Sequence, residues 1–167
     1  MGDKRRFDQF AKLVYKAFPQ IVNWSVADVA GGKGYLRGAL RDLGVKNVET
    51  WDIRHQQSKN NPGERWGLFK YDKAPKYDLV LGMHPDGATD HIVLHAARHK
   101  VPFVVCPCCV KPSATAYFGP YKYGAWLQHI KSLGVSNGFY VDECILPISG
   151  CNRVLIGTPS AFGASKK

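Results

Sequence analysis

The sequence lacks any run of about 20 apolar residues, so no membrane-spanning helix is expected. It begins with charged residues, where a secretory signal would carry an apolar core, and we therefore expect a cytoplasmic protein. Cysteine is scarce, with five in 167 residues, and Cys106, Cys108 and Cys109 crowd together. That spacing differs from a secreted disulfide framework, so the thiols are expected to be reduced.

Acidic residues are few as well. The 13 Asp and Glu residues face 23 Lys and Arg residues, which gives a formal net charge of +10. Clustered cations release counterions from a phosphate backbone, so this charge favours nucleic acid as a partner. A charged surface that serves only solubility is the alternative. Hydrophobic residues make up 45% of the chain, which is the composition of a folded globular domain and not of a disordered chain.

The spacing of apolar residues predicts alternating strands and helices. Strands are expected at residues 24–29, 47–53, within 66–71, and at 78–83, 102–106, 140–146 and 152–157, with helices at 3–18, 36–43, 88–99 and 123–134. Each strand before the last pair is expected to be followed by a helix. The pattern predicts an α/β fold with a mostly parallel seven-stranded sheet, helices on both faces and an antiparallel edge hairpin. We expect one domain over residues 1–162 and a loose tail at 163–167.

A glycine-rich turn follows the first predicted strand. It reads Asp28-Val29-Ala30-Gly31-Gly32-Lys33-Gly34. Ligands of open α/β sheets bind beyond the carboxyl ends of the strands, and glycine lets the backbone approach a ligand closely. Asp52 ends the second strand eighteen residues after Gly34, where a carboxylate can accept hydrogen bonds from both hydroxyls of an adenosine ribose. Together they predict a nucleoside pocket, with an ordinary turn and a helix-capping Asp as the alternative.

Two classes of cofactor fit such a pocket. Gly32, Gly34 and Gly38 satisfy the GxGxxxG spacing of some nicotinamide sites, which would indicate an NADP-dependent reductase. Asp28 followed by Ala30, Gly32 and Gly34 instead fits a DxGxGxG pattern with one Ala replacement. Through this pattern the chain resembles class I methyltransferases. The seven-stranded sheet of that family also ends in an antiparallel pair of strands, so the resemblance covers nearly the whole chain.

The resemblance implies a Rossmann-like fold that binds S-adenosyl-L-methionine. It places Asp28 and the turn at the methionine end of the cofactor, Asp52 at the ribose and Asp72 at the adenine. The full set of cofactor-binding residues that we expect is Asp28, Ala30, Gly31, Gly32, Gly34, Asp52, Ile53, Asp72 and Met83.

Polar residues follow the fourth predicted strand, whose carboxyl end points at the cofactor's methyl group in this fold. Methyl transfer needs a nucleophile that is held in line with the methyl group and relieved of its proton. We expect His84 and Asp86 to orient that nucleophile or to take its proton, and Asp90 and Lys111 complete the predicted catalytic set. The alternative is that the two acids only cap the helix that follows.

Three separated motifs carry a finer resemblance. They are His-Pro-Asp-Gly-Ala-Thr-Asp at 84–90, Pro-Cys-Cys at 107–109 and Gly-Cys-Asn-Arg at 150–153. The set distantly resembles tRNA 2′-O-methyltransferases with motifs close to HxCGxATD and CCH. Asp86 stands where those enzymes have cysteine, Val110 where they have histidine, and we see no zinc-finger segment before the domain.

The finer resemblance implies methyl transfer to RNA, with a ribose 2′-hydroxyl preferred over a base nitrogen. The catalytic fold leaves little room for a separate recognition domain, so substrate choice is expected to come from the chain's own basic and aromatic loops or from a recognition subunit. The alternatives are a methyltransferase acting on protein or a small molecule, and a scaffold that keeps the cofactor pocket without catalysis.

Basic residues near the predicted cleft are expected to follow RNA phosphates. They are Lys4, Arg5, Arg6, Arg54, Lys59 and Arg65. Aromatic residues in the segment 117–123 are expected to stack on exposed bases, with a solvated basic face and ordinary core residues as the alternative. Cys106, Cys108, Cys109 and Cys151 offer four thiolates, but the spacing is wrong for a usual zinc site and no metal is expected.

Overall fold

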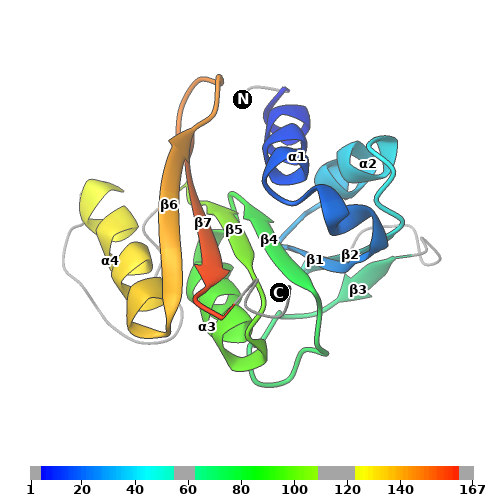
Figure 1. The fold of residues 1–167 in the computed structure, drawn as a ribbon. Coiled ribbons are helices and arrows are strands. Elements are labelled where there is room, and N and C mark those ends of the chain that lie inside the picture. The colour runs from blue at the N-terminus through cyan, green and yellow to red at the C-terminus, as the bar shows by residue number, and fades with distance from the viewer. Residues whose placement is uncertain (1–4, 55–62, 109–122, 162–167) are drawn as a thin grey trace.

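The computed structural model describes residues 5–54, 63–108 and 123–161 (Figure 1). Several predictions fall on other positions and so lie outside the described residues. These concern Lys4, Lys59, Cys109, Val110, Lys111, most of the aromatic segment 117–123 and the tail at 163–167.

A single seven-stranded sheet crosses the described part of the molecule in the order β3-β2-β1-β4-β5-β7-β6. Its strands are β1 (Ser25–Val29), β2 (Asn47–Asp52), β3 (Glu64–Trp66), β4 (Leu79–Met83), β5 (Phe103–Cys106), β6 (Phe139–Ile145) and β7 (Arg153–Pro159). The first five strands are parallel, and β7 runs antiparallel to both β5 and β6. The chain moves outward from β1 to β3 and then returns to the other side of β1 as β4. The carboxyl ends of β1 and β4 are therefore the place where such sheets bind ligands.

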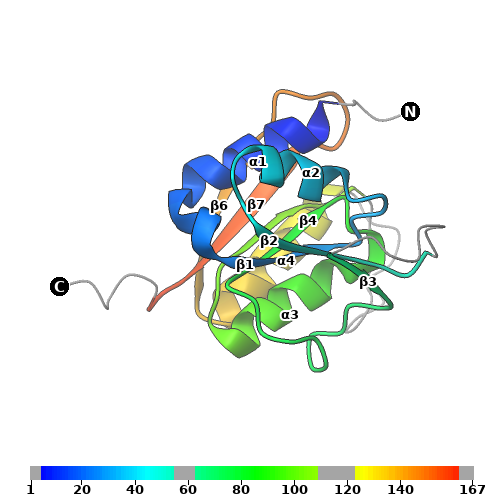
Figure 2. The ribbon, with the colours of Figure 1, turned by 90° about the vertical axis from the view of Figure 1, so that its right-hand side faces the viewer.

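Helices cover both faces of the sheet, as Figure 2 shows with the sheet nearly edge-on. They are α1 (Arg6–Ala17), α2 (Tyr35–Asp42), α3 (Thr89–His99) and α4 (Tyr123–Ser136). Phe10 and Leu36 bring α1 and α2 into one core cluster, and Ile92 and Trp126 bring α3 and α4 into a second on the opposite face. The predicted mostly parallel sheet, the two helical layers and the antiparallel edge pair are confirmed.

The region around β3 differs from the prediction. No helix follows β3, since residues 67–78 run to β4 through turns and extended chain, and β3 overlaps the predicted range only at Trp66. The apolar residues that suggested a longer strand are used elsewhere. Phe69 is buried, with its ring centroid 5.5 Å from that of Trp51 and 5.1 Å from that of His95 on α3. The prediction was wrong here because Phe69 packs into the core beside the sheet and does not pair within it.

Among the described helices, none combines the length and the apolar character that a membrane crossing requires.

Candidate functional site

The glycine-rich turn leaves β1 and leads into α2, with Gly34 at the N-cap of the helix. Ala30 (φ 56°), Gly32 (φ 58°) and Gly34 (φ 74°) all adopt left-handed backbone conformations, which are strained for alanine. Gly31 is required for a different reason, because a Cβ there would lie 2.1 Å from Oδ2 of Asp28. The turn therefore closes tightly around the carboxylate of Asp28.

Asp28 is buried with only 1% of its surface exposed. The hydroxyl of Thr50 donates a hydrogen bond of 3.1 Å to Oδ2, while Oδ1 is buried without a hydrogen-bond partner among the described residues. Burial raises the pKa of Asp28 to about 7, against the opposing effects of Thr50 and Arg37. A buried carboxylate with an unsatisfied oxygen costs stability, so its presence at this turn suits a ligand that brings a donor or a positive charge.

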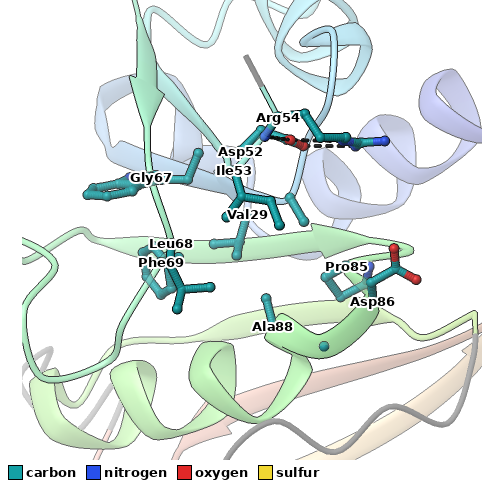
Figure 3. Close-up of a pocket in the computed structure, with 13 residues that line it drawn as sticks. Val29, Asp52, Ile53, Arg54, Gly67, Leu68, Phe69, Pro85, Asp86 and Ala88 are labelled. Carbon is teal, nitrogen blue, oxygen red and sulfur yellow. Dashed lines mark hydrogen bonds and ion pairs between the residues drawn. The ribbon is translucent and has the colours of Figure 1, made fainter. Parts of the chain in front are cut away.

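Asp52 ends β2 with its carboxylate facing the turn. The backbone N–H of Gly32 donates a hydrogen bond of 2.7 Å to Oδ2, so the turn and the carboxylate stand next to each other. Arg54 binds the same carboxylate with its backbone N–H at 2.8 Å and with Nε and Nη2 at 2.9 Å each (Figure 3). Burial acts to raise the pKa of Asp52, but the hydrogen bonds from Arg54 and Gly32 hold it below its usual value.

The hydrogen bonds from Arg54 affect the predicted role of Asp52 as the residue that binds the ribose hydroxyls. Ribose hydroxyls cannot bond to both carboxylate oxygens while the guanidinium occupies them, so Arg54 must turn away when a ribose binds. Its side chain is 68% exposed and can turn into solvent, whereas the Asp52 side chain is only 6% exposed, so the ribose hydroxyls have to replace the hydrogen bonds that Arg54 withdraws.

Two adjoining hollows open beside the turn. The apolar hollow has a volume of about 250 Å³, and its wall includes Val29, Trp51, Ile53, Leu68, Phe69 and Ala88. The polar hollow has a volume of about 390 Å³, and its wall includes Asp28, Gly31, Gly32, Met83, His84 and Cys108. Ala30, Arg54 and Asp86 line both. One hollow has a mainly apolar wall and its neighbour a more polar one, which suits a ligand with a flat base at one end and charged groups at the other.

Residues 67–69, which follow β3, form part of the wall of the apolar hollow. Leu68 and Phe69 line it together with Ala88, which Figure 3 shows on the short turn that precedes α3. Asp72, predicted to contact adenine, is exposed and lines neither hollow. Leu68 and Phe69 are absent from the predicted site because their apolar pattern predicts a strand, although an apolar pair just after a strand at the ligand edge was an available signal.

His84 and Asp86 lie in a strained segment at the end of β4, with φ of 58° and 50°. Nε2 of His84 lies 2.9 Å from the carbonyl oxygen of Cys151. Burial lowers the pKa of His84, so the ring is neutral near pH 7; Nε2–H then donates to that carbonyl and Nδ1 is left as the basic nitrogen. Of the four non-glycine residues with positive φ in the described chain, Ala30, His84 and Asp86 line the hollows. Such clustering of strain is typical of functional sites.

Asp90 stands apart from this segment. Its side chain is fully buried at the start of α3, where an acid is favourable to the helix, and Oδ1 lies 3.7 Å from Nε2 of His129 on α4. It lines neither hollow, so the structure separates Asp90 from His84 and Asp86 and places it between α3 and α4.

The predicted phosphate-binding residues divide into two groups. Arg54 is held by Asp52, and Arg65 is held by Glu49 through an Nε–Oε2 contact of 2.7 Å. Arg6 lines the polar hollow, and Arg5 is exposed at the N-cap of α1. Of the four described candidates, Arg54 and Arg65 are therefore already paired with carboxylates.

Cys108 lines the polar hollow, and Cys151 contacts Cys108. Sγ of Cys151 lies 3.1 Å from the carbonyl oxygen of Cys108, and Sγ of Cys108 lies 3.7 Å from Oδ1 of Asp86. Burial raises the pKa of Cys106 to about 12, so this thiol stays protonated. Among the residues that the structure describes, no group of three or more His, Cys, Asp or Glu side chains is arranged to hold a metal ion.

No model of a known protein family matches the sequence. A human protein named "Probable tRNA (uracil-O(2)-)-methyltransferase" is 29% identical over 163 residues, which cover 86% of this chain. The chain spans about a fifth of that relative, 21% of its length.

Solved structures of methyltransferases share the fold. A ribosomal protein L11 methylase from Lactobacillus delbrueckii subsp. bulgaricus has a TM-score of 0.65 at 18% identity, covering 95% of this chain and 81% of its own. A Burkholderia thailandensis N1-methyltransferase solved with bound S-adenosylhomocysteine has a TM-score of 0.57 at 12% identity, covering 93% of this chain and 77% of its own. The chain has the Rossmann-like fold of class I methyltransferases.

Proposed function

We propose that this chain is an S-adenosylmethionine-dependent methyltransferase that acts on RNA, with a ribose 2′-hydroxyl preferred over a base nitrogen. The observation that carries the proposal is that the turn around Asp28, the carboxylate of Asp52 and the strained His84–Asp86 segment all border one pair of adjoining hollows. The name of the human relative and the net charge of +10 support RNA as the substrate.

The residues fit the proposed cofactor. Oδ1 of Asp28 is a buried acceptor that lacks a partner among the described residues, and it suits the amino group of the methionine end. Asp52 suits the ribose once Arg54 has turned away, and Leu68 and Phe69 suit the adenine. When bound, S-adenosylmethionine supplies an electrophilic methyl group on a positively charged sulfur.

The chain's own residues then have to prepare the nucleophile. His84, neutral and fixed through Nε2, offers Nδ1 as a general base for a ribose hydroxyl, a role that typically contributes about 10²–10⁴-fold to a rate. Asp86, which lines both hollows, is placed to orient the hydroxyl or the imidazolium that forms. Asp90 and Lys111 stay predictions as catalytic residues, as do a cytoplasmic location and a recognition subunit.

Transfer of a tritiated methyl group onto separate RNA, DNA and protein pools tests the function. We expect label in RNA, and after alkaline hydrolysis we expect it in dinucleotides, because a methylated 2′-oxygen cannot attack the neighbouring phosphate. Label in mononucleotides would move the target to a base. Label only in protein or a small-molecule fraction would overturn the RNA assignment.

A second arm tests catalysis by this site. His84→Ala should lower transfer by at least about 10²-fold while binding of S-adenosylhomocysteine stays within about twofold of wild type. Transfer that is unchanged in a His84→Ala, Asp86→Ala double variant would show that the chemistry lies elsewhere.

A further inference from the structure

One side of the polar hollow is lined by α1, the turn before α2 and the start of α2, and of its residues the assignments above use only Arg6, as a predicted phosphate contact. We call this side the α1–α2 rim; its residues are Arg6, Phe7, Lys33 and Tyr35. The rings of Phe7 and Tyr35 lie 5.5 Å apart between centroids at an angle of 37°, and the Arg6 guanidinium lies 4.6 Å from the Phe7 ring centroid. Tyr35 is 59% exposed, so its ring is available to a ligand.

The charge of the rim is not neutralised within the described chain. Among the described residues, no carboxylate lies within ion-pairing distance of Arg6 or Lys33, whereas Arg54, Arg65 and Arg37 each have one. Arg6 is also close to the proposed base, since it adds to the effect of burial in lowering the pKa of His84. An exposed aromatic ring and free positive charge therefore adjoin the reacting end of the site.

We propose that the α1–α2 rim binds an unpaired nucleotide of the RNA substrate beside the methylated ribose. Tyr35 stacks on the base, and Arg6 and Lys33 contact the phosphate. Stacking on an aromatic ring and phosphate neutralisation are the two means by which proteins bind single strands, and both are present here within one wall. The inference rests on the proposed function, because it names a substrate contact of the same site.

Fluorescence anisotropy of a labelled single-stranded oligouridine with the full chain and saturating S-adenosylhomocysteine tests the rim. Tyr35→Ala should weaken binding about tenfold, and Tyr35→Phe, which keeps the ring, should stay within about twofold. Tyr140→Ala on β6 is the matched control, since Tyr140 is also an exposed tyrosine, and it should bind as wild type does.

The charge arm uses Arg6→Ala and Lys33→Ala, with Arg98→Ala on α3 as the control. Each rim variant should weaken oligouridine binding about tenfold and reduce its dependence on salt, whereas the control should do neither. A duplex of the same length should bind more weakly than the single strand, and binding of the duplex should not depend on Tyr35.

The proposal is overturned if Tyr35→Ala binds oligouridine as the Tyr140→Ala control does, or if polyglutamate displaces the RNA as well as unlabelled oligouridine does. It is also overturned if Arg6→Ala loses S-adenosylhomocysteine in calorimetry but keeps RNA, because Arg6 would then belong to the cofactor site. If the proposed methyltransferase function is wrong, the outcome of these experiments differs from the outcomes above. The wild-type chain would then neither bind S-adenosylhomocysteine nor transfer methyl groups, while the Tyr35-dependent binding of RNA would persist.

Discussion

The buried carboxyl group of Asp28 should make the stability of the protein depend on pH in an unusual direction. Burial raises its pKa from 3.8 to about 7, so the folded state holds the proton more tightly than the unfolded chain does. The carboxyl group therefore adds no penalty below about pH 4, and the folded state loses stability as the pH rises through about 7. Most surface acids, whose pKa values fall on folding, have the opposite effect.

The size of the effect follows from the two pKa values. The difference between 3.8 and about 7 corresponds to about 4 kcal/mol in total, of which about 2–3 kcal/mol develops between pH 5 and pH 8. Asp28→Asn removes the titrating group and keeps the shape of the side chain. The variant should therefore lack this part of the pH dependence, whatever its absolute stability.

Urea denaturation of both proteins at pH 5 and pH 8 measures the difference. Between these pH values the wild type should lose about 2–3 kcal/mol more than Asp28→Asn does. Asp42→Asn, at an exposed position of α2, is the control and should follow the wild type. Equal pH dependence of wild type and Asp28→Asn would refute the reasoning, because the carboxyl group would then titrate alike in the folded and unfolded chains.

The remaining predictions concern the turn, the ion pair at the ribose site and the support of β3. Gly31→Ala places a methyl group 2.1 Å from a carboxylate oxygen and should lower the melting temperature by about 4–10 °C. Gly38→Ala meets open space on a helix and should raise stability by about 0.5–1 kcal/mol; equal shifts in thermal unfolding would argue against a tight turn. Arg54→Ala frees the neighbouring carboxylate and should tighten S-adenosylhomocysteine binding up to about fivefold in calorimetry, and weaker binding would contradict the displacement of this side chain. Arg37→Met breaks a buried ion pair, whose side chains are 5% and 9% exposed, and should cost about 3–5 kcal/mol in urea unfolding; a loss below about 1 kcal/mol would show that the pair does not hold β3.

The parts of the site that the sequence could predict are those set by chain order. Asp28, the turn and Asp52 follow one another along adjacent parallel strands, so the topology of a βαβ unit brings them together. The pairing of Arg54 with Asp52 could also have been predicted from the sequence. An Asp side chain often accepts a hydrogen bond from the backbone N–H two residues on, and this contact, present here at 2.8 Å, brings the side chain of Arg54 beside the acid.

Other features depend on contacts between distant segments, and no local pattern encodes them. His84 is fixed by the carbonyl of Cys151, 67 residues away. Asp90 reaches His129 on α4 because two helices pack together, and Phe69 leaves the sheet because a core position beside α3 is open to it. Position at the site also escapes the sequence, since the helical spacing of Leu36 and Leu40 predicts the buried face but not that Tyr35, which is 59% exposed, lines the polar hollow.

Calorimetric titration of S-adenosylhomocysteine into the wild-type chain and into Asp52→Ala, with NADPH as the rival ligand, probes the identity of the nucleoside pocket most directly. We expect one molecule of S-adenosylhomocysteine to bind the wild type, at least about tenfold weaker binding to Asp52→Ala through loss of charged hydrogen bonds to the ribose, and no heat from NADPH. Heat from NADPH alone, or equal binding of S-adenosylhomocysteine by both proteins, would contradict the assignment.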